Sequence, residues 1–501
     1  MKVINVMNFI RQCDPRNPVI DELLYPTAKA QLEMVTRMDV DHTFLLQYDT
    51  LCDQKYVDLF KGGATEKTEL GLWFEIVREM TDAVGLPYKS EKGWKWDWHI
   101  VPGFSMGYSV EEREMLIDEA MRKFKEIYGF YPRTVASWTI DTHTVNYLTE
   151  KYNISAIGVC RDQVSTDAYT MIGGYFNQAY YPSKKNMFTP AKTQEMQVNV
   201  PVFRLLGPDP IHNYDQDKYI SENCADKMNC YTMEAVWVGP HPNVMDWLYK
   251  TYYENEDLGF SYSQIGQENT FGAQERNLVA YIQEHIEKAK KLPGVTFMKM
   301  GDTGEWFKKQ YPTHTPATAV TALDNWDRED IQSVYYDSRF YTANLFRHEN
   351  NILFRAIYAF DENAEDRYIR EKCTTFDAVY ENQPVVDTVI WGKDTEKCGM
   401  YLDTTGEPFS VEKVSDTQLK ASWGDKQVVF SEDRMEIHGC AADFYPGEAK
   451  AEISVFPDAI AYKYRGRKYA LRVVDGTVQQ KESCIQICPT AEKMTLMIET
   501  E

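Results

Sequence analysis

The first two thirds of the chain alternate short apolar runs with longer amphipathic segments. The apolar runs predict strands at residues 3–9, 43–48, 69–75, 134–141, 155–160, 200–206, 260–266 and 295–300. Strands that alternate with helices are typical of a parallel sheet, and seven or eight such units predict a (β/α)7-8 barrel. The sequence therefore predicts an α/β fold whose first domain, residues 1–326, is a barrel.

The amphipathic segments carry the signals that begin and end a helix. Ser109 and Glu112 have the spacing of a capping box, and Gly129 is a C-terminal stop for a helix over 109–128. Apolar residues recur on one face of this segment. A second helix is predicted over 274–292, ending before Pro293.

The pattern changes after about residue 326. From residue 333 onward, short alternating strands are separated by polar turns, as in QVVFSED and KYALRVVDG. This pattern of short strands and polar turns predicts a C-terminal β-sandwich-like domain over 333–501. Its acids fall in turns such as FDENAED, where Asp and Asn serve turn geometry. We therefore expect this domain to contribute no catalytic acid and to place no carboxylate beside Asp141.

Charge and composition limit the classes of molecule that the chain is expected to bind. The 501-residue chain has a net charge of −22, which argues against nucleic-acid and anionic-membrane partners, since both require basic patches. No run of eighteen apolar residues is present, so we expect no membrane span. Aromatic residues make up 13%, which suits either sugar stacking or large cores. The sequence does not indicate an oligomeric state.

The compartment is predicted from the N-terminus and the cysteines. MKVINVMNFI is too short and polar for a signal peptide and predicts a first strand. The ten Cys are scattered without a paired CxxC zinc pattern, as expected of free thiols. The sequence thus predicts a cytoplasmic protein, with a removed leader as the alternative.

Polar side chains follow most of the predicted barrel strands at the end where parallel barrels form their active sites. A single acid at a strand end is usually a helix cap, but several on one rim predict a reaction site. The candidates at these ends are Asp49, Trp73, Glu75, Asp141, His143, Asp162, Gln163, Arg204 and Glu268.

Paired carboxylates suit the cleavage of a glycosidic bond, in which one acid protonates the leaving oxygen and a second carboxylate attacks the sugar or activates water. Glu75 follows the apolar run LGLWF, which favours a raised pKa and the acid role, with Asp141 as its partner and Glu268 as the substitute. The alternatives are a salt bridge from Glu75 to Arg78 and a helix-start role for Glu268.

Two loops are candidates for substrate contacts. In the loop that contains KWDWHIVPGF, Trp94, Trp96 and Trp98 suit sugar stacking, and His99 is a further candidate for substrate binding, although buried Trp anchors would look the same. Asp162, Gln163 and Asp167 begin a long polar and aromatic loop after the fifth strand, and such loops usually have a function.

Asp97, His99, Asp141 and His143 could instead supply a zinc site, which needs about three such ligands. We expect that no cofactor is required, with one zinc ion as the alternative.

The segment SWTIDTHTVNYL resembles the W-x-I-D-x-F motif of the family 38 glycoside hydrolases, the α-mannosidases. This resemblance implies that Asp141 is nucleophile and metal ligand together. The first-strand motif H-x-H-N-D-P of that family is similar to IRQCDP here, which keeps Asp14 and Pro15 but neither His.

TVASWTID and the strand order also resemble polysaccharide deacetylases and family 57 glycoside hydrolases over about residues 1–330. These families share an irregular (β/α)7 barrel. The third strand, ELGLWFEIV, lacks the His of the deacetylase metal motif, whereas family 57 enzymes use two carboxylates and no metal.

The favoured hypothesis is a glycosidase acting on an oligosaccharide or glycoconjugate. The alternatives are a metal-dependent deacetylase-like hydrolase and a non-catalytic carbohydrate-binding protein.

Overall fold

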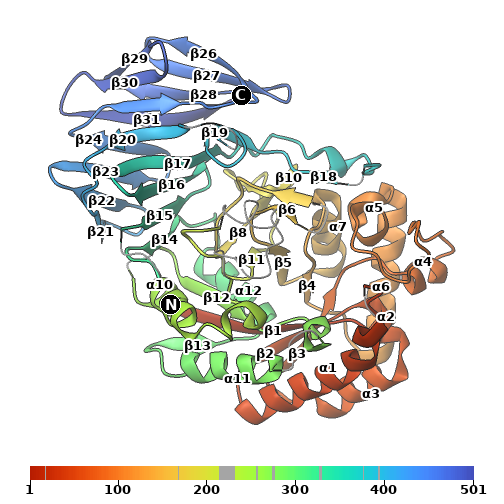
Figure 1. The fold of residues 1–501 in the computed structure, drawn as a ribbon. Helices are drawn as coiled ribbons and strands as arrows, with labels where there is room; N and C mark the ends of the chain where they lie inside the picture. Colours follow the sequence, from red (N-terminus) through yellow and green to blue (C-terminus); the bar gives the residue numbers. More distant parts are fainter. Residues whose placement is uncertain are drawn as a thin grey trace.

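The computed structural model describes residues 1–16, 18–166, 169–213, 232–255, 258–273, 277–326, 330–375, 377–392, 395 and 397–501. A curved parallel sheet forms the N-terminal part, with helices on its outer face (Figure 1). Its strands follow the order β12-β1-β2-β3-β4-β5-β11, and each neighbouring pair is parallel. They are β1 (Lys2–Ile10), β2 (His42–Leu46), β3 (Thr68–Trp73), β4 (Thr134–Ala136), β5 (Ala156–Cys160), β11 (Val202–Leu205) and β12 (Ser261–Ile265).

Two short strands complete this sheet. β13 (Val295–Phe297) pairs with β1 in parallel, and β8 (Ala179–Tyr180) pairs with β11 in the antiparallel direction. The predicted α/β architecture of strands and helices is confirmed. In the described part of the chain, the hydrogen-bonded strand order ends at β12 on one side and at β8 on the other. The curved sheet therefore forms part of a barrel.

Two predicted strands are longer than the observed ones. The strand expected over 134–141 ends at Ala136, because the chain leaves the ladder and Asp141 becomes the N-cap of α7 (Thr142–Tyr152). The strand expected over 295–300 ends at Phe297, and helix α12 (Met300–Gln310) begins at Met300.

The predicted helix over 109–128 is confirmed as α6 (Val110–Tyr128). Ser109 and Glu112 form the capping box, and Gly129 closes the helix at φ 85°, a conformation that favours glycine. The predicted helix over 274–292 is shorter, as α11 (Leu278–Ala289). The remaining helices are α1 (Pro18–Met38), α2 (Tyr48–Cys52), α3 (Gln54–Gly63), α4 (Arg78–Ala83), α5 (Ile100–Gly103), α9 (Ala235–Val238) and α10 (Pro242–Tyr253).

The C-terminal part consists of two large antiparallel sheets, drawn at the upper left of Figure 1. The first contains β14 (Thr318–Ala322), β15 (Gln332–Asp337), β16 (Tyr341–His348), β17 (Asn351–Ala359), β19 (Gln383–Asp387), β20 (Gly399–Asp403), β25 (Ala442–Tyr445), β29 (Gly476–Gln480) and β30 (Ile485–Pro489). The second contains β21 (Ser410–Lys413), β22 (Leu419–Trp423), β23 (Lys426–Ser431), β24 (Arg434–His438), β26 (Glu452–Phe456), β27 (Ala459–Tyr464), β28 (Arg467–Val474) and β31 (Lys493–Thr500).

Side chains from both sheets form one hydrophobic cluster, which includes Phe354, Phe430 and Leu471. The division of the chain into residues 1–326 and 333–501 stays a prediction, and β14 pairs with β15 although it precedes that boundary.

The two parts are joined by buried aromatic and polar contacts. Phe176 stacks on Tyr335 of β15, with 3.7 Å between ring centroids. The backbone N–H of Phe176 donates to Asp337 Oδ1 at 3.0 Å. The structure also contains two small sheets. One is built from β6 (Gln163–Thr166), β7 (Tyr169–Met171) and β18 (Ala378–Val379), and the other from β9 (Pro182–Ser183) and β10 (Asn186–Pro190).

In the described part of the chain, we find no helix with the length and apolar character needed to cross a membrane.

Candidate active site

Arg11 lies at the centre of a buried charged cluster at the C-terminal ends of β1, β3 and β12. Its Nε and Nη2 form one edge of the guanidinium and contact Glu75, with Nη2 to Oε1 at 3.1 Å. Its Nη1 donates to Glu268 Oε2 from the other edge. One cation therefore lies between two carboxylates that are far apart in the sequence.

Glu75 is the inner carboxylate of this cluster and has no exposed surface. Besides Arg11, Gln47 Nε2 donates to its Oε2 at 2.7 Å. Burial raises the pKa of Glu75, the charge of Arg11 opposes this rise, and the charge of Glu268 adds to it. The contact that the sequence offered as an alternative, a salt bridge to Arg78, is not the one observed, because Arg11 takes that place.

Glu268 is the outer carboxylate and keeps 5% of its side chain exposed. Among the described residues, no donor contacts its second oxygen, Oε1. The turn that delivers Glu268 needs Gly266, because a Cβ at that position would lie 1.7 Å from the Met7 carbonyl oxygen. Asn269 then accepts from the Arg11 backbone N–H at 3.0 Å and donates to its carbonyl at 2.9 Å. These bonds fix the loop after β12 against the end of β1.

The tryptophans of the predicted sugar-stacking loop lie against the same cluster. Trp96 is 1% exposed, and the Arg11 guanidinium lies 4.1 Å from its ring centroid. Trp98 is partly exposed and stacks on Trp94, with centroids 5.0 Å apart. Arg16 lies over both Trp96 and Trp98. Trp98 thus keeps part of its surface exposed near the cluster, whereas Trp96 packs against Arg11.

Trp73, which was also predicted to bind substrate, is fully buried. It stacks on Phe9 with 4.3 Å between ring centroids and meets Trp138 edge-on at 5.0 Å. These contacts make Trp73 part of the sheet interior beneath the cluster.

One carboxylate near this cluster, Glu234, was missed from the sequence. Gln267 Nε2 donates to its Oε1 at 2.8 Å, and Thr232 Oγ1 donates to its Oε2 at 3.0 Å. Burial raises the pKa of Glu234, and the charge of Glu268 raises it further. Glu234 precedes the short helix α9, in a stretch without a strand pattern, so the search at strand ends could not find it.

Asp141 lies in a separate, fully satisfied network. Its Oδ1 accepts from Arg113 Nη1 at 2.9 Å and from the Thr144 N–H at 3.0 Å. Its Oδ2 accepts from Ser105 Oγ at 2.5 Å and from Thr144 Oγ1 at 2.7 Å. Asp141 therefore caps α7 and pairs with a buried Arg, and none of these contacts is with Glu75 or Glu268.

A carboxylate of the C-terminal part does lie near Asp141, which corrects the expectation that none would. Asp366 accepts from the Thr142 N–H at 3.3 Å and from Thr142 Oγ1 at 2.7 Å. Burial raises the pKa of Asp366 to about 6, and the charge of Asp141 contributes to the rise. The turn FDENAED was expected to serve only local geometry, but it also folds back onto the start of α7.

Other predicted contact residues hold the loops of the barrel rim. Asp49 accepts from the backbone N–H groups of Gln12 and Cys13, and burial raises its pKa to about 7. Asp162 pairs with Arg204, with Nη2 to Oδ1 at 2.7 Å, and both side chains are buried. Asp162 also accepts from the Gly173 N–H at 2.8 Å.

Gln163 is 4% exposed, and its Oε1 accepts from the Cys160 thiol at 3.3 Å. Asp167, also predicted to bind substrate, lies outside the described residues.

The four residues considered as zinc ligands do not converge. His99 Nδ1 pairs with Asp97 Oδ1 at 2.6 Å, while His143 Nε2 pairs with Glu114 Oε1 of α6 at 3.0 Å. Within the described ranges, no group of three or more His, Cys, Asp or Glu is arranged to hold a metal ion. These donors therefore do not fit the zinc site that the sequence allowed.

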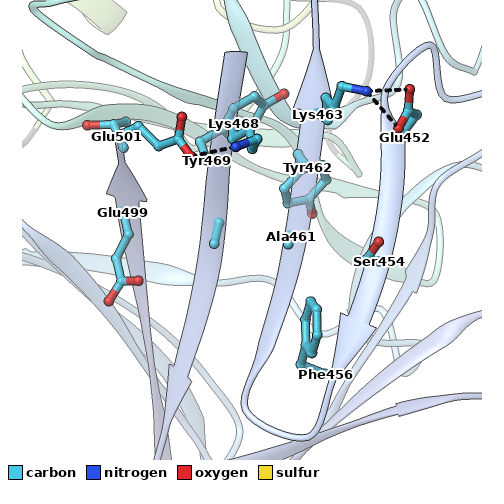
Figure 2. Close-up of a pocket in the computed structure, with 12 residues that line it drawn as sticks. Glu452, Ser454, Phe456, Ala461, Tyr462, Lys463, Lys468, Tyr469, Glu499 and Glu501 are labelled. Atoms are coloured by element: carbon cyan, nitrogen blue, oxygen red, sulfur yellow. Dashed lines mark hydrogen bonds and ion pairs between the residues drawn. The ribbon is translucent and has the colours of Figure 1, made fainter. Parts of the chain in front are cut away.

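A hollow of about 480 Å³ lies on the outer face of β26, β27, β28 and β31 (Figure 2). Figure 2 shows Lys463 paired with Glu452 and Lys468 paired with Glu501 along its rim. All four side chains are mostly exposed, and such pairs are ordinary on a solvated sheet. The charged cluster around Arg11 is therefore the stronger candidate for chemistry.

No protein-family model matches this chain, and no curated protein matches it. Among solved structures, it is similar to a Parabacteroides distasonis protein provisionally described as a glycoside hydrolase/deacetylase. That match has 12% identity, covers 76% of this chain and 88% of the other, and has a TM-score of 0.52.

Weaker matches are a provisionally described polysaccharide deacetylase from Pseudomonas aeruginosa (13% identity, 62% and 92% coverage, TM-score 0.37) and the 4-α-glucanotransferase of Thermococcus litoralis (9% identity, complete coverage of both, TM-score 0.29). The first match shows a shared fold, as the resemblance to the deacetylase and glycoside hydrolase barrels implied.

Proposed function

We propose that the chain is a carbohydrate-active enzyme that hydrolyses glycosidic bonds at the cluster around Arg11, with Glu268 as the carboxylate beside the anomeric carbon. The observation that carries this proposal is the unequal state of the two oxygens of Glu268. Oε2 is bound by Arg11, while Oε1 has no donor among the described residues, and the side chain keeps some exposure. A carboxylate that is held at one oxygen and open at the other is suited to reaction.

The neighbours of Glu268 support this role. Gln47 donates to Glu75, and Glu75 in turn holds the guanidinium of Arg11, so that Arg11 presents Nη1 to Glu268 in one orientation. A sugar with developing positive charge at the anomeric carbon would be stabilised by the negative charge of Glu268. Trp98 is partly exposed beside Arg16, so its ring could contact a sugar bound next to the cluster.

Glu268 either attacks the anomeric carbon itself or takes a proton from an attacking water. The configuration of the first product distinguishes the two, since direct attack followed by hydrolysis retains the configuration and water attack inverts it. Proton NMR of the fresh product measures this configuration.

The proposal is tested with a panel of nitrophenyl α- and β-glycosides and a matched panel of acetylated oligosaccharides. We expect release of nitrophenol from at least one glycoside, with loss of that release in Glu268→Gln. Release of acetate without cleavage of any glycoside would contradict the proposal and favour a deacetylase. Binding of oligosaccharides without turnover in either panel would favour a non-catalytic carbohydrate-binding protein.

A further inference from the structure

The segment that carries Glu234 bridges the two ends of the parallel strand order. The Met233 N–H donates to the Leu206 carbonyl, just after β11, at 2.8 Å. Glu234 itself forms a parallel bridge with Gly266, just after β12. Because β11 and β12 are at opposite ends of the parallel order, this segment spans the opening of the curved sheet at its C-terminal edge.

The Glu234 side chain is directed toward the interior side of that edge. It lines a small cavity together with Met7, Phe9 and Gln264, which lie on β1 and β12. It is 8% exposed, and each of its oxygens accepts one hydrogen bond from a neutral donor, Gln267 or Thr232. Among the described residues, no guanidinium or ammonium group donates a hydrogen bond to Glu234.

We infer that Glu234 is the proton donor for the glycosidic bond cleavage proposed above, so this inference rests on the proposed function. The Glu234 carboxylic acid gives its proton to the glycosidic oxygen as the bond from that oxygen to the anomeric carbon breaks. The electron pair of the broken bond goes to the leaving oxygen, which departs as an alcohol. Glu234 is left as a carboxylate, and Glu268 supplies the negative charge at the anomeric carbon.

The environment of Glu234 supports the protonated form before cleavage. Burial and the charge of Glu268 raise its pKa, whereas Gln267, Thr232 and the charge of Arg161 lower it. When Glu268 is neutralised by reaction at the anomeric carbon, one cause of the rise disappears, so Glu234 becomes a stronger acid as its proton is needed.

Glu75 meets these requirements less well, although the sequence predicted it as the acid. It has no exposed surface, and the guanidinium of Arg11 contacts both of its oxygens. A proton on Glu75 would have to displace one of these charge-assisted bonds, and no exposed atom could pass it to a substrate. Glu75 is therefore a positioning residue for Arg11.

The test compares wild type with Glu234→Gln on phenyl and 2,4-dinitrophenyl glycosides of the sugar that the panel identifies. Loss of a general acid should reduce kcat/KM on the phenyl glycoside by about 10² to 10⁴-fold. The dinitrophenyl glycoside needs no proton, so its loss should stay below about tenfold. In Glu234→Gln, the basic limb of the pH profile of kcat/KM should also disappear. Equal losses on both substrates would overturn the inference.

Thr232→Val provides a second test that does not remove the carboxylate. Without the Thr232 hydroxyl, the pKa of Glu234 should rise, so the basic limb should move to higher pH. If the basic limb of Thr232→Val stays at the wild-type pH, the inference is overturned. This test remains valid even if Glu234→Gln fails to fold. If Glu268→Gln retains wild-type turnover, the proposed function itself fails. If Glu268→Gln is inactive but Glu234→Gln shows no dependence on the leaving group, the proposed function stands and only the assignment of the acid fails.

Discussion

Arg11 and Glu75 meet edge to edge, with Nε and Nη2 of the guanidinium facing the carboxylate and Nη2 3.1 Å from each carboxylate oxygen. The two side chains are 1% and 0% exposed. A buried pair of this kind adds little net stability, because desolvation costs roughly as much as the charges recover. The remaining Nη1 of this guanidinium donates to Glu268.

Arg11→Met should destabilise the fold because it leaves Glu75 and Glu268 buried without their cation. Breaking a buried pair usually costs about 3–5 kcal/mol. The loss should grow with pH, since removing Arg11 raises the pKa of Glu75 further and ionising it then becomes costlier. Urea unfolding at pH 5 and pH 8 measures both effects.

The double variant Arg11→Met with Glu75→Gln is the control for that experiment. It removes the cation and one of the stranded charges together, so it should be less destabilised than the sum of the two single variants. Simple additivity would show that Arg11 and Glu75 do not interact energetically, contrary to their contact.

Glu75→Gln should lower turnover without any preference for the leaving group. The amide keeps the shape of the carboxylate but loses its charge, so Arg11 is no longer held toward Glu268. Phenyl and 2,4-dinitrophenyl glycosides should therefore lose activity by the same factor within about threefold, the usual context dependence of such effects. Rescue by the better leaving group would instead make Glu75 the acid, as the sequence predicted.

Substitutions of Asp141 distinguish a structural role of this residue from a catalytic one. Asp141→Ala removes a helix cap and strands Arg113, and the lost cap alone should cost about 1 kcal/mol. Asp141→Ser keeps a capping oxygen and should recover part of this stability. If Asp141 positions α7, turnover per folded molecule should fall less than about tenfold in the Ser variant. A loss of several powers of ten in a folded Ser variant would restore the catalytic role that the W-x-I-D resemblance implied.

Asp337 should make the unfolding free energy fall as pH rises. Burial raises its pKa from 3.8 to about 7 in the folded state, so the folded chain holds this proton more tightly than the unfolded chain. The contribution of Asp337 to the unfolding free energy is highest below the pKa of 3.8 that this group has in the unfolded chain. It is lost as pH rises toward 7, by about 4 kcal/mol in total for such a shift. Asp337→Asn should flatten this slope between pH 4 and pH 7 in urea unfolding. An unchanged slope would show that other groups cause it.

The fold could be predicted from the sequence where pattern and local chemistry agree. Helix α6 was predicted with both of its ends, because Ser109, Glu112 and Gly129 are local signals. The strand before Asp141 was predicted too long, since an apolar run does not show where the chain leaves the ladder. Element types could thus be predicted more reliably than their ends.

The site could be predicted only in part. Glu75 and Glu268 were expected at one edge because both follow strands of a parallel sheet, and both contact Arg11 there, while their catalytic roles stay a prediction. The role of Arg11 was not anticipated, because nothing local shows that one guanidinium contacts two carboxylates 64 and 257 positions away. Glu234 was missed for the same reason, since its position depends on the bridge to Gly266.

Whether Glu268 reacts at the sugar is measured by kcat/KM of Glu268→Gln on the best nitrophenyl glycoside. The matched control is Glu287→Gln, an exposed glutamate on α11. We predict that Glu268→Gln, folded as judged by circular dichroism, loses at least about a thousandfold, or roughly 4 kcal/mol of transition-state stabilisation, while the control keeps wild-type activity. A folded Glu268→Gln within about tenfold of wild type would contradict the account.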